Sequence, residues 1–229
     1  MQTLIAASLL ALTSSAALAA PVVFSTVEFS TSTLASAGDA FDGVNEHVSP
    51  PLPGISDANA LGLTSAATAF AFADTGMLVV TTSADGAGEQ ADAAATARFF
   101  GTLASTTGGA VELFVDFDHQ LDATGDALGS LSLLISVTSG AGLLFNQTYD
   151  ASIDLRLGFM LPAGSSSLDL TLIGDGSAFD GSAFSLGSVG FDLQSVDSQT
   201  VPEPGTLALS ALALAGALGL RRRNAAKPD

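Results

Sequence analysis

The chain has 229 residues, no cysteine and a formal net charge of −17 at pH 7. Without cysteine the protein has no disulfide, no thiolate nucleophile and no zinc–thiolate site. The acidic excess argues against nucleic acid as a partner, because nucleic-acid recognition depends on basic patches.

The first predicted element is an apolar segment at the N-terminus, residues 4–19. It ends in Ala17 and Ala19 separated by a leucine, the A-x-A pattern of a signal-peptide cleavage site, and we place the cut after Ala19. The first three residues carry no Lys or Arg, which departs from the usual positively charged start of a signal peptide. We predict a signal peptide at 1–19 and an exported domain at 20–200.

The exported domain has the patterning of an all-β protein. Its clearest strand candidates alternate apolar and polar residues with a period of two, at 111–118, 131–138, 153–160 and 168–173. Less regular candidates lie at 22–30, 67–73, 77–83, 94–104, 142–149 and 184–196. Glycine-containing turn signals separate them, at 107–109, 124–126, 140–142, 162–164 and 174–176. About ten short strands predict a two-sheet β-sandwich that is jelly-roll-like.

Two stretches of this domain have no clear period. In the alanine-rich stretch 87–97 we favour a strand that begins at about residue 94, and a short helix at 88–94 is the alternative. Residues 38–66 contain Pro50-Pro51 and Pro53-Gly54, which predict an irregular loop. Such a loop caps one end of the sandwich or forms part of a ligand surface.

Calcium is the best chemical candidate in this domain. Calcium is bound by six to eight oxygen atoms of carboxylates, carbonyls and waters. We take Asp116, Asp118 and Asp122 as the candidate metal ligands, although no acidic segment matches the EF-hand pattern. Aspartate and glycine are also common turn residues, so solvated turns are the alternative interpretation. No other cofactor is predicted.

The sequence favours a non-enzymatic protein. The two histidines, His47 and His119, are 72 residues apart, and no nucleophile-elbow pattern is present. We interpret His119 as a solvated loop residue at a strand end. Asp116 and Asp118 are a conceivable carboxylate pair for glycoside hydrolysis. Sugar clefts usually need aromatic platforms, however, and the chain has no tryptophan and one tyrosine.

The C-terminal segment, residues 201–229, has three parts in a fixed order. Pro202, Glu203 and Pro204 form a stiff spacer, since proline fixes φ and removes a backbone donor. An uncharged run at 205–220 follows, which as a single transmembrane helix is about 24 Å long. Three basic residues, Arg221, Arg222 and Arg223, end the run. Basic residues stay in the cytoplasm, so the exported domain is expected outside.

This order resembles the PEP-CTERM sorting signal of Gram-negative bacteria, over residues 201–223. The resemblance implies recognition and cleavage by an exosortase, a membrane-embedded cysteine transpeptidase. It also implies that Pro202, Glu203 and Pro204 are the recognition residues and Arg221–Arg223 the stop. The substrates of such enzymes are exported proteins of bacteria that make exopolysaccharide.

The sequence therefore predicts an inner-membrane intermediate with its N-terminus outside, and then a cell-surface or extracellular-matrix protein associated with exopolysaccharide or biofilm. The exported domain holds two basic and 21 acidic residues, a formal charge of −19, so it is repelled by anionic lipid and is kept soluble by self-repulsion. The alternatives are a calcium-dependent carbohydrate-binding module and, ranked lowest, a surface polysaccharide hydrolase.

Overall fold

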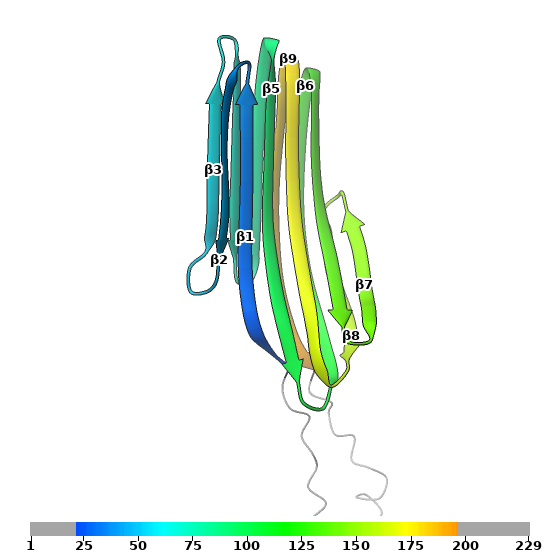
Figure 1. The fold of residues 1–229 in the computed structure, drawn as a ribbon. Coiled ribbons are helices and arrows are strands. Elements are labelled where there is room, and N and C mark those ends of the chain that lie inside the picture. The colour runs from blue at the N-terminus through cyan, green and yellow to red at the C-terminus, as the bar shows by residue number, and fades with distance from the viewer. Residues whose placement is uncertain (1–21, 197–229) are drawn as a thin grey trace, which may run out of the picture. The chain divides into compact units, whose positions relative to one another are not determined.

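In the computed structural model, which describes residues 22–196, nine strands form a single open antiparallel sheet (Figure 1). This confirms the all-β prediction. The signal peptide, the sorting segment and the helix predicted at 205–220 lie outside the described residues. The strands are β1 (Val23–Ala37), β2 (Ala40–Val48), β3 (Gly54–Leu61), β4 (Ser65–Asp74), β5 (Met77–Ser105), β6 (Gly109–Ser139), β7 (Gly142–Tyr149), β8 (Ile153–Leu161) and β9 (Gly164–Val196).

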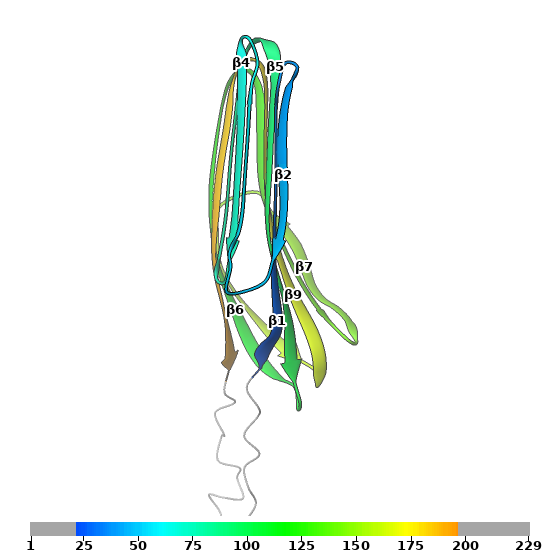
Figure 2. The same cartoon turned by 60° about the vertical axis from the view of Figure 1, so that its left-hand side comes forward.

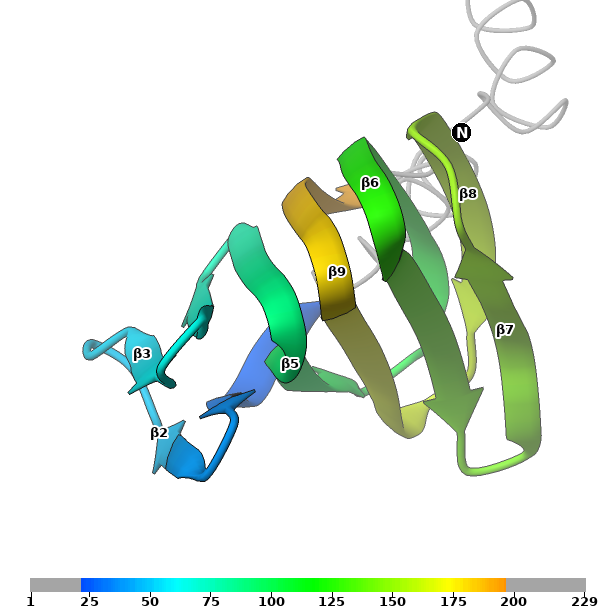
Figure 3. The ribbon, with the colours of Figure 1, turned by 90° about the horizontal axis from the view of Figure 1, so that it is seen from above.

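Three of these strands are long enough to cross between two layers. β5, β6 and β9 have 29, 31 and 33 residues, and each arches over at one end of the sheet (Figure 3). The bends of β5 and β6 contain glycines in the left-handed region, Gly88 with φ of 80° and Gly125 with φ of 67°. The register shifts close to these bends, between Ala87 and Ala91 and between Asp126 and Ala127. The protein therefore has one sheet folded over on itself, and the prediction of two separate sheets, as in a jelly roll, is wrong.

The folded sheet has two layers that face each other (Figure 2). Layer 1 contains β1, β2, β7 and the halves of the long strands at 91–105, 127–139 and 164–178. Layer 2 contains β3, β4, β8 and the other halves, at 77–87, 109–126 and 180–196. Each layer buries one face against the other, as in a sandwich.

The core between the layers is apolar and unusually rich in alanine. Phe99 of layer 1 is fully buried, and its ring centroid lies 6.0 Å from that of Phe29 and 4.7 Å from that of Phe191 in layer 2. Thirteen buried alanines of β1, β3, β4 and β5 fill the part of the core near β3 and β4: Ala35, Ala37, Ala58, Ala60, Ala67, Ala69, Ala71, Ala73, Ala84, Ala91, Ala93, Ala95 and Ala97. The described residues 22–196 belong to one compact unit with this core of their own.

The prediction of an irregular loop at 38–66 is wrong, because most of these residues form β2 and β3. The proline-rich part is confined to the short connection between these strands. In β3 the buried positions are Gly54, Ser56, Ala58 and Ala60, and the exposed ones include Ile55 and Leu61. The inward residues are so small that hydropathy does not show the alternation.

The other uncertain stretch, 87–97, is a strand, so the alternative of a short helix at 88–94 is wrong. The turns predicted at 107–109, 140–142 and 162–164 coincide with connections between strands. The signals at 124–126 and 174–176 lie inside β6 and β9 instead. The first marks the bend of β6, and Gly174 and Gly176 face the core next to Ser185 and Thr82, where a side chain has little room.

Side-chain carboxylates close one edge of the sandwich. Asp42 and Glu46 of β2 accept hydrogen bonds from the backbone N–H groups of Asn59 and Ile55, which lie on the edge strand β3. These bonds satisfy donors that would otherwise be open to another strand. The two layers are therefore joined along the β2–β3 side.

At the bent end, three chain segments meet at one carboxylate. Glu89, in the bend of β5, accepts hydrogen bonds from the backbone N–H of Thr64 (3.1 Å) and the hydroxyl of Ser65 (2.9 Å). Gly38, in the β1–β2 turn, packs so closely on the Glu89 side chain that a Cβ there would collide with it. The hydrogen bonds from Thr64 and Ser65 lower the pKa of Glu89.

The Glu89→Gln substitution is expected to remove a pH-dependent part of the stability. A lowered folded-state pKa contributes stability above the unfolded pKa, and this contribution is lost as the pH falls through the folded value. The wild-type protein should therefore melt above the variant at pH 7, and the gap should shrink below pH about 4.3, near the ordinary glutamate pKa. Thermal melts of both proteins from pH 7 to 2.5 measure this difference in melting temperature. A difference that does not change with pH would contradict the prediction.

Both ends of the described segment leave the sandwich at the end opposite the bends (Figure 1). Val23 pairs with Ala104 near the end of β5, and Val196 pairs with Ala110 near the start of β6. The short β5–β6 connection joins these two sites. The first and last described strands therefore emerge next to the same hairpin.

Candidate functional site

The outer face of layer 1 is a broad surface of small hydroxyl side chains. It arises because about half of the residues that alternate with the core positions of β1, β9 and the second half of β6 are serine or threonine, and β5 adds Thr96 and Thr102. Its hydroxyl residues include Thr26, Ser30, Ser32, Thr96, Thr102, Ser132, Ser136, Thr138, Ser167 and Thr171. Such a face offers donors and acceptors to a hydroxyl-rich ligand.

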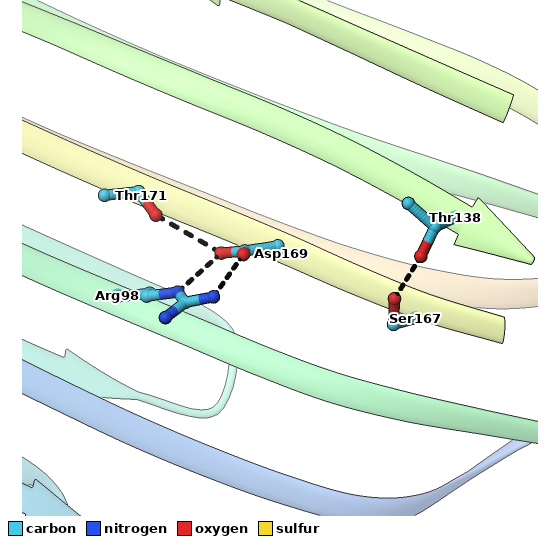
Figure 4. Close-up of polar contacts among 5 residues, drawn as sticks. All are labelled: Arg98, Thr138, Ser167, Asp169 and Thr171. Carbon is cyan, nitrogen blue, oxygen red and sulfur yellow. Dashed lines mark hydrogen bonds and ion pairs between the residues drawn. The ribbon is translucent and has the colours of Figure 1, made fainter. Parts of the chain in front are cut away.

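An ion pair lies in the middle of this face (Figure 4). Arg98 of β5 donates from Nε to Oδ1 of Asp169 (2.9 Å) and from Nη2 to Oδ2 (2.5 Å), a bidentate contact with β9. Thr171 donates to the same Oδ1 at 3.2 Å, and the guanidinium carbon of Arg98 lies 5.6 Å from the centroid of the Phe100 ring. The hydrogen bond to Asp169 raises the pKa of Arg98, so this cation is held in place and stays charged.

A hydroxyl pair lies beside the ion pair (Figure 4). Thr138 of β6 and Ser167 of β9 are cross-strand neighbours with their oxygen atoms 2.5 Å apart. Ser167 is two residues from Asp169 on the same face of β9. The ion pair and the hydroxyl pair thus form one polar strip across β5, β9 and β6.

Two hollows open on the outer face of layer 1. The first, of about 180 Å³, lies beside Arg98 and is also lined by Glu28 and His47, whose Nε2 is 3.7 Å from a Glu28 carboxylate oxygen. The second, of about 470 Å³, lies nearer the bends and contains Asp92 and Asp175 between two leucines, Leu34 and Leu128. Both hollows are shallow and suit an extended ligand better than an enclosed one.

The three predicted metal ligands lie on the outer face of layer 2. Asp116, Asp118 and Asp122 are exposed at alternate positions of β6. At about 3.4 Å per residue, Asp116 and Asp122 are about 20 Å apart, so a single ion cannot contact both carboxylates. Among residues 22–196, no three side chains of the Asp, Glu, His and Cys types converge on one point.

The closest acidic neighbour of Asp116 comes from another strand. Asp154 of β8 is directly opposite Asp116 in the register, and Gly190 of β9 is opposite it on the other side. Gly190 has open space where a side chain would be, so this part of the surface is uncovered. Arg156, two residues after Asp154 on β8, forms an ion pair with Glu112 of β6. The calcium site stays a prediction, and Asp116 with Asp154 is the pair that this register brings together.

The histidines are separated in the structure. His47 lies on β2 against Glu28. His119 is part of β6 and not of a loop, in contrast to the prediction, and its ring stands edge-on to Phe117 with centroids 5.9 Å apart. Its Nε2 atom is buried and has no hydrogen-bond partner within residues 22–196.

The predicted sorting residues and the predicted cleavage residues lie outside the described part of the chain. They are Ala17, Ala19, Pro202, Glu203, Pro204, Arg221, Arg222 and Arg223. The sequence analysis missed the Arg98–Asp169 pair, which joins residues 71 positions apart. The available signal was that Arg98 is one of only two basic residues in an acidic domain.

Comparisons with known proteins locate the family resemblance at the C-terminus. The family described as the PEP-CTERM protein-sorting motif matches residues 200–223. No curated protein matches the chain. Two solved structures of VP2 from infectious bursal disease virus are 10% identical to it. The subviral particle covers 87% of this chain and 74% of its own, with a TM-score of 0.15. A point mutant in T=1 particles covers 89% and 72%, with a TM-score of 0.14. TM-scores this low do not establish a shared fold.

Within the described residues there is no helix with the length and apolar character needed to cross a membrane.

Proposed function

Because the chain carries a PEP-CTERM protein-sorting motif and is thus an exported protein sorted by an exosortase, we propose that it is a non-enzymatic component of the cell surface or extracellular matrix. The single observation that carries this proposal is the match at residues 200–223, which begins four residues after the last strand.

The proposed route begins with export and ends with processing. The signal peptide at 1–19 delivers the domain outside, and Arg221–Arg223 hold the C-terminal end of the apolar segment in the cytoplasm. The exosortase then acts at the Pro202–Pro204 spacer. In this proposal the C-terminal segment is a sorting signal that is removed, and the strand-rich unit is the mature protein.

The outer faces support an association with exopolysaccharide. Layer 1 presents serine and threonine hydroxyls around the Arg98–Asp169 pair, and hydroxyl and carboxylate groups suit the dense hydroxyls of a polysaccharide. The formal charge of −19 on residues 20–200 keeps the domain soluble and repels anionic lipid.

The intact mass of the protein recovered from its native host, fraction by fraction, tests this proposal. A mass that begins at Ala20 and ends between Pro202 and Gly205, in the surface or matrix fraction, is the expected result. A mass that still contains Arg221–Arg223 would show a permanent membrane anchor instead. A domain found in the cytoplasmic fraction would refute the proposal.

The alternative function is a calcium-dependent carbohydrate-binding module at the acidic face of layer 2. The observation in its favour is the opposition of Asp116 and Asp154 next to the uncovered position at Gly190. In this alternative, Ca²⁺ would take oxygen ligands from these carboxylates and from the sugar.

Calcium at millimolar concentration is expected to raise the melting temperature by several degrees if this alternative holds, because a ligand that binds only the folded state stabilises it. The variant Asp116→Ala/Asp118→Ala should lose the shift, and Asp57→Ala/Asp85→Ala, with the same change in charge, should keep it. Scanning fluorimetry measures the shift in melting temperature, with magnesium in place of calcium as a second control. The absence of a calcium shift would exclude this alternative. Turnover of a polysaccharide lost on a single aspartate substitution would point to the hydrolase instead.

A further inference from the structure

The sandwich has four edge strands, and one of them differs in charge from the others. β2 and β3 end the two layers on one side, and β7 and β8 on the other. β2 carries Asp42 and Glu46, β3 carries Asp57, and β8 carries Asp154 and Arg156. β7, with the sequence GLLFNQTY, has no charged residue and no proline. Charges and prolines are the usual means by which edge strands avoid pairing with other chains.

The fold closes the opposite edge and leaves β7 uncovered. Two outward N–H groups of β3, those of Ile55 and Asn59, are bonded by carboxylates of β2. Within residues 22–196, β7 pairs with β6 alone, so its other side presents unpaired N–H and C=O groups. Unpaired ladder groups on a strand are best satisfied by another strand.

The side chains of β7 are exposed on both faces. Leu143 is 61% exposed and Leu144 40%, and only Phe145 and Tyr149 are partly buried. Phe145 fixes the strand to β8 through an edge-to-face contact with Phe159, with centroids 5.9 Å apart. Leu144 is a bulge in the pairing with β6, after which the ladder is regular from Phe145 to Tyr149. This regular segment is a preformed, anchored strand of five residues.

Charge determines which partner fits this edge. Two copies of a domain with a formal charge of −19 repel each other over most of their surfaces. The β7 edge lets the backbones approach without setting two carboxylates directly opposite each other. Charges farther away than about 10 Å are screened at 0.1 M salt. Identical edges satisfy each other when they are related by a two-fold axis.

We propose that β7 pairs with β7 of a second copy of this chain, antiparallel about a two-fold axis, so that two six-stranded layers become one continuous sheet. The antiparallel direction is that of every other pair in this sheet. The pairing leaves the hydroxyl face of layer 1 continuous across the dimer. Because the copies run in opposite directions, the last described strand, β9, ends at Val196 on opposite sides of the axis, and the bends of the two copies point away from each other. This inference does not depend on the proposed function.

Single cysteines provide the test, because the natural chain has none. Positions 143–149 are replaced one at a time by cysteine in the full chain, purified in detergent and cross-linked by oxidation or by a short bismaleimide. Antiparallel pairing predicts a maximum at one position, or at two neighbouring ones, with a decline on both sides. Opposed Cβ atoms lie about 4.5–5.5 Å apart, close to the spacing of a disulfide. The exposed Thr68→Cys of β4 is the control and should not cross-link.

A charge variant tests the same edge without altering the fold. Gln147→Glu, at an exposed site, sets two carboxylates close together across the axis and should reduce the maximal cross-link at least tenfold. Gln120→Glu, exposed on the central strand β6, adds the same charge elsewhere and should leave it unchanged. Equal cross-linking at every position would show parallel pairing, and no preference for β7 over Thr68→Cys would show no pairing. Either result overturns the proposal, as does a cross-link unaffected by Gln147→Glu.

Discussion

Replacing Pro202, Glu203 and Pro204 together with alanine is expected to keep the whole C-terminal segment on the protein. No helix is expected to run through the wild-type spacer, because each proline fixes φ and lacks a backbone donor. Three alanines would let the apolar run at 205–220 extend as a helix towards the domain. The exosortase would then meet a helix instead of an extended spacer. The expected result is complete retention in the membrane fraction with a mass that includes Arg221–Arg223.

Intact mass and fractionation in the native host measure this effect. Pro162→Ala, in the exposed β8–β9 connection, is the matched control and should be processed normally. Changing Arg221–Arg223 to glutamine should weaken retention of the C-terminal tail in the cytoplasm, because the proposed orientation depends on these charges. Normal processing of the triple alanine variant would show that another part of the chain carries the signal.

Phe99→Ala is expected to be the most destabilising single substitution in the strand-rich unit. The Phe99 ring is fully buried and contacts Phe24 and Phe29 of layer 1 and Phe191 of layer 2, so its removal opens a cavity between the layers. Truncation of a buried phenylalanine costs about 3–5 kcal/mol in the free energy of unfolding. That loss is a large share of the roughly 5–15 kcal/mol of a typical domain.

Urea unfolding followed by far-UV circular dichroism measures this loss, because a chain with no tryptophan and one tyrosine gives little intrinsic fluorescence. Phe41→Ala is the control. Phe41 is 70% exposed, so its removal should change the stability by no more than about 0.5 kcal/mol. A similar loss in both variants would mean that the two layers do not pack through Phe99.

The sequence predicted the strands where large apolar residues alternate with polar ones, as at 111–118 and 131–138. It could not predict β3, whose inward residues are glycine, serine and alanine. It also divided β9 at Gly174 and Gly176, which serve close packing in the core and not a turn. Hydropathy measures the size of the apolar group, and in this protein part of the core is built from side chains too small to give a signal.

The continuity of the sheet was equally hidden. A strand of 33 residues that bends between layers has the same local pattern as two strands with a turn, and only the hydrogen-bonded register distinguishes them. For the same reason the Arg98–Asp169 pair could not be predicted, because it depends on which residue of β9 lies opposite β5. The sorting segment was predictable because its physical signals, proline spacing, apolar length and terminal charge, all lie close together in sequence.

The long strands give the protein a mechanical character. The last described strand ends at Val196, and the bends of β5, β6 and β9 lie at the other end (Figure 1). A load applied at the bends and resisted at Val196 acts along the strands, while the ladder hydrogen bonds of an antiparallel sheet run across them. Such a pull loads many bonds in shear at once and does not peel them one by one. The sheet is therefore expected to resist a pull between Val196 and the bends more strongly than a pull that peels an edge strand away.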